Sequence, residues 1–255
     1  MFKDIKKIRT KLILAFLIPI LLIAFQGIVT YSNSSKMAKE NIKNASVASM
    51  ESTGKYMDVI LQTVENLTTQ IFADSDIQDY LISNYDTEDV IERMTLTRNV
   101  ESALHNIAMF TPEINSIILI PIDDNVNPVA TFSTRSTVKY SDISEASFVK
   151  ATEAEQDRSV WVGTHEELDE KTGLTKDKYS LSYVRIIRST LTAQVSGIII
   201  ADLKPDVLRE VSDSQVMHDG QLFSLITPDN RIITNGTDVT AESNLTSQEF
   251  FMRLK

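Results

Sequence analysis

The first thirty residues constrain this chain most strongly, because they join a basic tip to a long apolar run. The run extends without interruption from Leu12 to Phe25 and resumes after Gln26-Gly27 at Ile28-Val29. Residues 12–29 would form a helix about 27 Å long at 1.5 Å per residue, close to the thickness of a bilayer's hydrocarbon core. We therefore predict a transmembrane anchor over residues 12–29, preceded by a basic stub over residues 1–11.

The charge on the two sides of this segment predicts its orientation. The first eleven residues carry five basic side chains against Asp4 alone, a net charge of +4. Of the 25 basic and 35 acidic residues in the chain, 20 and 34 then remain after the anchor, a net charge of −14. Because positive flanks stay in the cytoplasm, we expect a cytoplasmic N-terminus in the cell membrane and an extracytoplasmic chain after about residue 31. The alternative is a cleaved signal peptide, but no small-x-small cleavage site follows Phe25.

Composition excludes several classes of function. The chain has no cysteine, which rules out disulfides, thiolate zinc sites and cysteine nucleophiles. A net charge of −10 argues against nucleic acid as a partner, because phosphate binding needs a basic face. The 7 glycines form no nucleotide-binding motif.

A long helix is predicted directly after the anchor. Residues 32–80 contain no proline and a single glycine, Gly54. The second half of this segment has alternating steps of three and four residues, which place one mostly apolar stripe along a helix: Met50, Thr53, Met57, Ile60, Val64, Leu67 and Ile71. Two interpretations remain open. The stripe either packs on the sheet of its own domain, or part of it is also the seam of a homodimer.

The pattern after residue 80 indicates an α+β domain. A second helix is expected from a cap at Asp86 to a stop before Thr111-Pro112. A helical connection is expected over residues 141–155. Short β-branched runs predict five strands: 114–122, 129–133, 160–163, 179–188 and 194–203. Turn residues separate them, among them the stretches 123–125 and 169–173. This order favours an antiparallel sheet with helices packed against it.

The same pattern begins again after Leu203. A helix is expected from Lys204-Pro205-Asp206 to about Val211, followed by a hairpin with strands at 222–227 and 231–234. Two strands cannot enclose a core. We therefore expect residues 205–255 to be the start of a second, truncated module of a longer protein.

Several of these stretches together resemble the extracytoplasmic part of bacterial double Cache sensors. They are Ile114-Asn-Ser-Ile-Ile-Leu-Ile120, Ser159-Val-Trp-Val-Gly163, Tyr179-Ser-Leu-Ser-Tyr-Val-Arg185, Gly197-Ile-Ile-Ile-Ala-Asp-Leu203 and Leu222-Phe-Ser-Leu-Ile-Thr-Pro-Asp-Asn-Arg231. The resemblance implies a PAS-like five-stranded sheet in each of two modules, the membrane-distal one within residues 32–204. It also implies the sensory region of a methyl-accepting chemotaxis protein, which we favour, or of a sensor histidine kinase. In both, the signalling part lies after a second membrane crossing.

The sequence offers no catalytic constellation. The histidines at 105, 165 and 218 are scattered, and none has a second histidine at i+3 or i+4. His165 lies in the polar stretch Gly163-Thr-His-Glu-Glu167, and we expect it in a solvated loop. No G-x-S-x-G elbow occurs. We therefore expect no catalytic residue, metal site or cofactor. A membrane-anchored extracytoplasmic enzyme is a competing class, and the predicted sheet argues against a third, an adhesin-like coiled coil.

The resemblance implies a ligand-binding site in the distal module. In amino-acid-binding relatives, arginine and aromatic residues near the third strand, a tyrosine on the fourth and an aspartate on the fifth frame the pocket. The matching positions here are Arg158, Trp161, Tyr179, Tyr183, Arg185 and Asp202. Period two puts Tyr179, Tyr183 and Arg185 on one strand face. The expected partner is a small-molecule ligand or a ligand-loaded binding protein.

The spacing departs from the family's amino-acid signature, because Arg158-Ser-Val-Trp161 does not reproduce it. Each residue also has an ordinary structural role open to it. Trp161 suits a core, Arg158 a solvated strand edge, and Asp202 the cap of the following helix.

Overall fold

The computed structural model describes residues 2–83, 90–175, 177–213, 223–227, 232–234, 237–239 and 250–253. The chain divides into two compact units, residues 1–51 and 52–255, which are described separately. Helix α1 (Phe2–Ala73) supplies all of the first unit and the beginning of the second.

The first unit contains the predicted anchor. The described side chains of residues 12–29 are exposed, and most are apolar. An 18-residue window of this helix has a mean hydropathy of 2.7, so its length and composition are sufficient to cross a membrane. Pro19 lies inside the helix, where a membrane span tolerates it better than a soluble helix does.

The second unit is built on a five-stranded antiparallel sheet, as predicted. Its strands are β1 (Ile114–Pro121), β2 (Val129–Ala130), β3 (Ser159–Val162), β4 (Ser182–Arg188) and β5 (Val195–Leu203). Their order in the sheet is β2-β1-β5-β4-β3, which places β5 and its long apolar run at the centre. The α+β class and the flanking helices predicted from the sequence are therefore confirmed.

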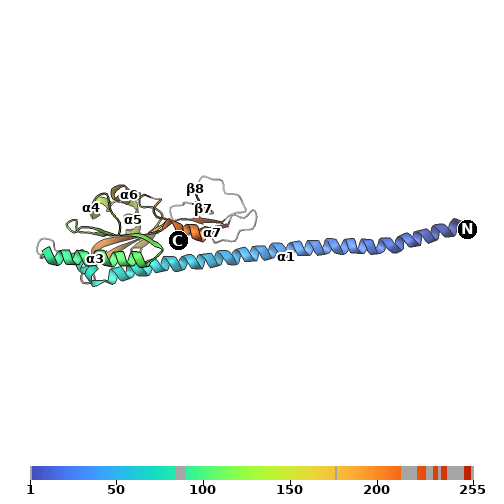
Figure 1. Cartoon of the computed structure of the whole chain (residues 1–255), viewed down its shortest axis with the longest axis horizontal. Coiled ribbons are helices and arrows are strands. Elements are labelled where there is room, and N and C mark those ends of the chain that lie inside the picture. Colours follow the sequence, from blue (N-terminus) through green and yellow to red (C-terminus); the bar gives the residue numbers. More distant parts are fainter. Residues whose placement is uncertain are drawn as a thin grey trace. The chain divides into compact units, whose positions relative to one another are not determined.

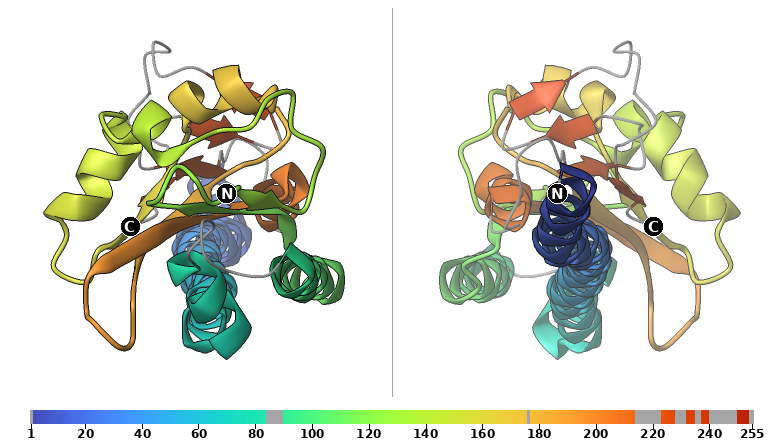
Figure 2. Two further views of the ribbon diagram at one scale, coloured as in Figure 1. Left: turned by 90° about the vertical axis from the view of Figure 1, so that its left-hand side faces the viewer. Right: turned by 90° about the vertical axis from the view of Figure 1, so that its right-hand side faces the viewer.

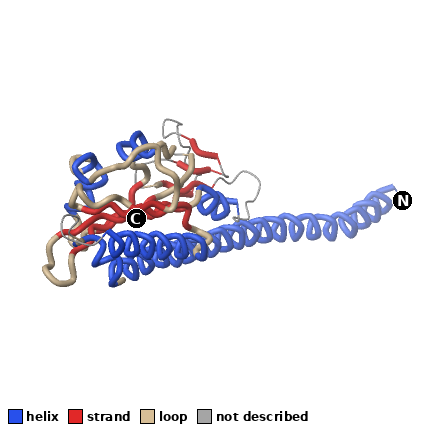
Figure 3. Tube along the Cα trace, turned by 60° about the vertical axis from the view of Figure 1, so that its left-hand side comes forward, coloured by secondary structure: helices blue, strands red, loops and turns tan. Residues whose placement is uncertain are grey.

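Helices cover both faces of this sheet (Figure 2). The C-terminal part of α1, α2 (Ser75–Ile82) and α3 (Val90–Phe110) lie on one face, here called the α1 face. The short helices α4 (Tyr140–Ile143), α5 (Ser147–Ala154) and α6 (Glu166–Thr172) lie on the other, here called the α5 face. Figure 3 shows the same layers by secondary structure.

The apolar stripe of α1 packs within its own unit from residue 53 onward. Thr53, Met57, Ile60, Val64 and Ile71 are buried, and Leu67 is half-buried. The interpretation that the stripe packs on its own domain is therefore confirmed for this part, and a homodimer seam stays a prediction.

The predicted helix over residues 32–80 is divided in the structure. It breaks at Asp74, whose side chain accepts a hydrogen bond from Ile77 N at 3.2 Å and caps α2. The end of α3 at Phe110 agrees with the prediction. Its predicted cap at Asp86 lies outside the described residues.

Two predictions on the α5 face need correction. The connection predicted as one helix is the pair α4 and α5, and residues 169–173, read as a turn, belong mostly to α6. Gly173 is the left-handed C-cap of α6, with a φ of 77°, so the glycine ends a helix instead of forming a loop. Strand β2 is also shorter than predicted, and β4 begins at Ser182, three residues later than predicted.

Branched side chains of the three central strands form the core on the α5 face. The register places Val184 beside Ile200 and Ile200 beside Ile118, and Phe148 and Leu168 cover them from α5 and α6. Burial of such side chains is the main stabilising contribution to a layered fold of this kind.

A second, smaller sheet follows α7 (Pro205–Asp213). It contains β6 (Phe223–Ile226), β7 (Ile232–Thr234), β8 (Thr237–Val239) and β9 (Phe250–Arg253), in the order β8-β7-β6-β9. The predicted helix and the antiparallel pairing of β6 with β7 are confirmed. The turn predicted at Pro228-Asp229-Asn230 lies outside the described residues. Figure 1 shows where these elements fall along the chain.

Candidate functional site

The six residues predicted to frame a ligand site do not form one group. Trp161, Tyr183 and Arg185 contact α1 or one another on the α1 face. Asp202 contacts His165 on the opposite face, and Tyr179, which precedes β4, joins them there. Arg158 lies just before β3. Tyr179 and Tyr183 therefore do not share a strand face, because β4 does not extend to residue 179.

The residues on the α1 face connect the sheet to the long helix. Trp161 Nε1 donates a hydrogen bond to Glu65 Oε1 at 2.9 Å, and its ring lies 5.0 Å from that of Tyr183. The Arg185 guanidinium lies 5.8 Å from the centre of the Tyr183 ring and donates to Thr69 Oγ1. Trp161 and Tyr183 are buried, so they serve packing between β3, β4 and α1.

Asp202 is buried and fully engaged by the chain's own groups. Its carboxylate accepts hydrogen bonds from Ser116 Oγ at 2.6 Å and Ser182 Oγ at 2.7 Å. His165 Nε2 lies 2.9 Å from Asp202 Oδ1. A carboxylate inside an apolar strand needs such partners, because a buried charge without them is costly.

His165 is the centre of this arrangement and was missed by the sequence analysis. The expectation of a solvated loop is wrong, because the side chain is 0% exposed. His165 Nδ1 lies 3.0 Å from Asp169 Oδ1, and its ring stacks on Tyr179 at 4.4 Å. The Tyr179 hydroxyl donates to Asp169 Oδ2 at 2.8 Å and accepts from the His165 backbone N–H at 3.1 Å. We call these four residues, His165, Asp169, Tyr179 and Asp202, the histidine cluster.

The carboxylates of the histidine cluster keep His165 charged near neutral pH. Burial disfavours the imidazolium, but the attraction of Asp202 and Asp169 outweighs it and raises the pKa of His165 to about 10. Burial also raises the pKa of the Tyr179 hydroxyl well above its usual value. An imidazolium thus sits between two carboxylates. The chain itself therefore supplies a cationic partner to Asp202.

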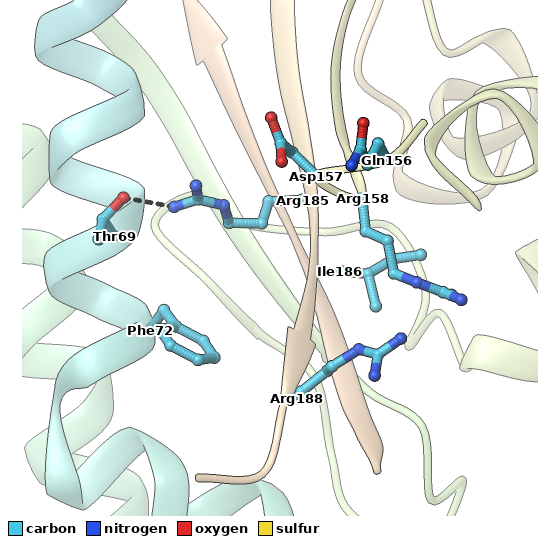
Figure 4. Close-up of a pocket in the computed structure, with 8 residues that line it drawn as sticks. All are labelled: Thr69, Phe72, Gln156, Asp157, Arg158, Arg185, Ile186 and Arg188. Carbon is cyan, nitrogen blue, oxygen red and sulfur yellow. Dashed lines mark hydrogen bonds between the residues drawn. The ribbon is translucent and has the colours of Figure 1, made fainter. Parts of the chain in front are cut away.

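A cavity of about 480 Å³ opens beside β4 and the end of α1 (Figure 4). It is lined by three arginines, Arg158, Arg185 and Arg188, together with Thr69, Phe72 and Ile186. Gln156 and Asp157 complete the lining. We call this cavity the arginine pocket.

The arginine pocket brings two predicted residues, Arg158 and Arg185, together with a third that the sequence analysis did not select. Arg188 ends β4 and donates to the backbone oxygen of Ala193 at 3.3 Å. In the sequence, Arg188 could have been selected from its position three residues after Arg185, at the end of the same strand. Arg158 O accepts from Ile186 N at 3.0 Å, which places the arginine of the turn beside β4.

Across the residues that the structure describes, no group of three or more histidine, aspartate or glutamate side chains has the arrangement of a metal site. In the histidine cluster, His165 Nδ1 and Nε2 each lie against a carboxylate oxygen, at 3.0 Å for Asp169 and 2.9 Å for Asp202. Asp169 Oδ1 makes this ion-pair contact without a hydrogen bond. The cluster is therefore a buried ionic network.

No protein-family model matches the chain. No curated protein matches it either. Solved structures do resemble it. The ligand-binding domain of the Pseudomonas aeruginosa amino-acid chemoreceptor PctC, in complex with GABA, is 13% identical with a TM-score of 0.43, and the match covers 69% of this chain and 64% of that one. This chain therefore spans slightly less than two thirds of the PctC domain's length.

Two further structures are similar at the same level. The Campylobacter jejuni chemoreceptor Tlp3 sensory domain with isoleucine bound is 17% identical with a TM-score of 0.42, and the match covers 73% of this chain and 72% of that one. The extracellular domain assigned to histidine kinase rpHK1S-Z16 is 11% identical with a TM-score of 0.44, covering 77% and 70%.

Proposed function

We propose that this chain is the extracytoplasmic sensory region of a membrane-bound chemoreceptor, which passes ligand occupancy across the membrane to a cytoplasmic signalling domain. One observation carries the proposal. Helix α1 contains both an apolar segment of membrane length and the buried face that packs in the sheet domain. A change in how that face packs therefore acts on the helix that contains the membrane segment.

The contacts between the sheet and α1 suit such a relay. Glu65 and Thr69 of α1 accept hydrogen bonds from Trp161 on β3 and Arg185 on β4. Packed interfaces of this kind shift by small discrete steps, of about 1–2 Å for a helix, instead of deforming continuously. A ligand that binds one arrangement of β3 and β4 more tightly raises the population of that arrangement, and α1 moves with it. The size of this population shift is set by the ligand's difference in affinity for the two arrangements.

Two other functions remain as alternatives to the proposal. A sensor histidine kinase would use the same extracytoplasmic device and differ in its cytoplasmic output. A membrane-anchored enzyme would need reactive groups open to a substrate. The histidine cluster fails that requirement, because His165 and Asp202 are 0% and 1% exposed. We further propose that the chain acts as a homodimer and senses a small molecule directly or through a ligand-loaded binding protein.

The membrane topology has a direct test, because the chain contains no cysteine of its own. The variants Thr10→Cys and Asn33→Cys would each carry a single thiol, on opposite sides of the apolar segment. In intact bacteria expressing the full chain, a membrane-impermeant maleimide should label Asn33→Cys and not Thr10→Cys. Labelling of Thr10→Cys alone, or release of the first thirty residues from the mature protein, would contradict the proposed anchor.

Ligand sensing is tested on the full chain in lipid nanodiscs by thermal shift. A panel of the twenty amino acids, mono- and dicarboxylates and inorganic phosphate should contain at least one compound that raises the Tm in proportion to its occupancy. If every compound leaves the Tm unchanged, direct sensing of these molecules is excluded and the binding-protein version is tested next.

A further inference from the structure

We propose that the arginine pocket binds a small organic anion with two carboxylate groups. The effect of this binding on the helix rests on the proposed sensory function. The proposal adds the class of the ligand and the place where it binds. The place differs from the surroundings of Asp202, where the family resemblance puts the amino-acid site.

The net positive charge of the arginine pocket favours the binding of an anion. Arg158, Arg185 and Arg188 are all half-buried, and no described carboxylate lies within ion-pair distance of any of them. Asp157 is the one acidic side chain among the lining residues, which leaves a net charge of +2 in a chain of net charge −10. Half-buried guanidinium groups are most stable when a carboxylate or phosphate accepts their paired N–H groups.

The positions of the arginines specify the shape of that anion (Figure 4). Arg158, Ile186 and Arg188 extend to one side of β4, whereas Arg185 extends to the other, toward Thr69, where Phe72 also lies. The apolar side chains of Ile186 and Phe72 contribute to the lining with them. Cationic groups on the two sides of β4, each with an apolar side chain beside it, match two carboxylates joined by a short carbon skeleton that lies across the edge of the strand. A monocarboxylate or an inorganic phosphate reaches only one of the two sides.

The backbone of Arg158 is a second, independent observation. Its φ is 50°, in the left-handed region where glycine and asparagine are the favoured residues. Such strain clusters at binding sites, where the side chain is needed despite its cost. Here a strained turn holds a guanidinium, free of hydrogen bonds to the described residues, in the lining of the cavity.

The pocket also has a direct path to the long helix. Arg185 donates to Thr69 Oγ1 and, at 3.4 Å, to Thr68 Oγ1, both on α1. A ligand carboxylate that pairs with Arg185 competes with these weaker neutral acceptors. Occupancy of the pocket therefore changes the polar contacts between β4 and α1.

Calorimetric titration of the full chain in nanodiscs with succinate tests the binding. We expect saturable binding at one site per chain, with butyrate and inorganic phosphate weaker by about tenfold or more, since each forfeits charge-assisted hydrogen bonds at one end. Arg188→Gln and Arg158→Gly should each weaken succinate by about tenfold or more. Arg209→Gln, which removes an exposed arginine outside the pocket, should bind as the parent chain does.

Loss of folding is excluded within the same series. Arg158→Gly relieves the left-handed strain, so its Tm without ligand should be equal to or above that of the parent while succinate binding is lost. The proposal is overturned if succinate does not bind, if Arg158→Gly and Arg188→Gln bind it as the parent does, or if phosphate binds as tightly as succinate.

The same samples separate this proposal from the sensory function. A nitroxide on Val59→Cys, an exposed position of α1, reports the mobility of the helix. Succinate binding without any spectral change would support the proposed binding site and contradict the proposed transmission through α1. A spectral change with another compound of the panel, but no succinate binding, would overturn the pocket and support the relay.

Discussion

The charge on His165 is held by residues that come from two distant parts of the chain. Asp169 lies one helical turn away on α6, whereas Asp202 lies on the central strand β5. The two carboxylates and the Tyr179 hydroxyl join α6 to the sheet through polar contacts, in addition to the apolar contact of Leu168. Removing one partner of such a buried network typically costs about 3–5 kcal/mol, because the remaining charge is left uncompensated.

The raised pKa of His165 predicts a pH dependence of stability. The folded chain binds the imidazole proton up to about pH 10, whereas the unfolded chain releases it near pH 6.5. The stabilising contribution is therefore complete below about pH 6.5 and is lost as the pH rises toward 10, by up to about 1.4 kcal/mol per pH unit. Denaturant unfolding of the full chain in detergent, followed by fluorescence of the single Trp161, measures this slope. His165→Gln should flatten it, and an unchanged slope in that variant would assign the effect to other groups.

Arg158 gives a prediction of the opposite sign, a substitution that stabilises. Arg158→Gly should raise the free energy of unfolding by about 1 kcal/mol, because glycine adopts a φ of 50° without the steric cost that a Cβ imposes. Arg158→Ala is the matched control, since it removes the same side chain and keeps the strain. Equal stability of the two variants would show that the backbone at residue 158 is not strained.

Helix α2 lies close to the strands beneath it at Gly197. A Cβ at this position would lie 2.8 Å from Leu81 Cδ2 and 2.9 Å from the backbone oxygen of Ile120. Glycine is therefore required by the close packing of α2 on β5 and β1.

Gly197→Ala should destabilise the domain by about 2 kcal/mol, because the added methyl group forces Leu81 or the β1 backbone to move. The midpoint of denaturant unfolding measures the loss. Gly27→Ala is the control, since a Cβ there meets nothing within 4 Å. If the unfolding midpoint of Gly197→Ala equals that of the control, Leu81 or the β1 backbone moves aside without a loss of stability, which contradicts the prediction.

The elements predicted correctly are those whose signal is local. The stripe from Met57 to Ile71 and the β-branched runs of β1, β4 and β5 carry their period in consecutive residues, so the helix and the sheet could be predicted. Helix α6 was missed because its polar sequence resembles a turn, with Leu168 as its one residue in the hydrophobic core cluster. Its Gly173 was a helix-end signal that was read as a loop.

The site was less predictable than the fold, because its contacts join residues far apart in the sequence. Asp202 inside an apolar strand indicated a buried polar group in need of a partner, but nothing local pointed to His165. Arg188 gained its role from the sheet edge, where β4 extends past β3 and approaches the turn that holds Arg158. Period two was applied to Tyr179 although β4 begins only at Ser182.

In the proposed function, one helix both anchors the chain in the membrane and packs in the sheet domain. Helix α1 carries an apolar segment suited to a membrane and a buried face within the sheet domain. Its polar contacts with β3 and β4 lie beside the arginine pocket. The proposed function needs no catalysis, because the binding free energy of a ligand would bias the packing of this helix.

The most direct test of this account is the distance between α1 and the β4–β5 turn, with and without ligand. Val59→Cys and Leu191→Cys are both exposed, and a chain without native cysteine allows nitroxides to be placed at these two positions alone. Pulsed electron paramagnetic resonance on the full chain in nanodiscs would then give the distance distribution. The account predicts a shift of about 1–2 Å when the compound that raises the Tm most is added to saturation, and no shift with an inactive compound of the panel. Identical distributions with and without that saturating ligand would contradict it.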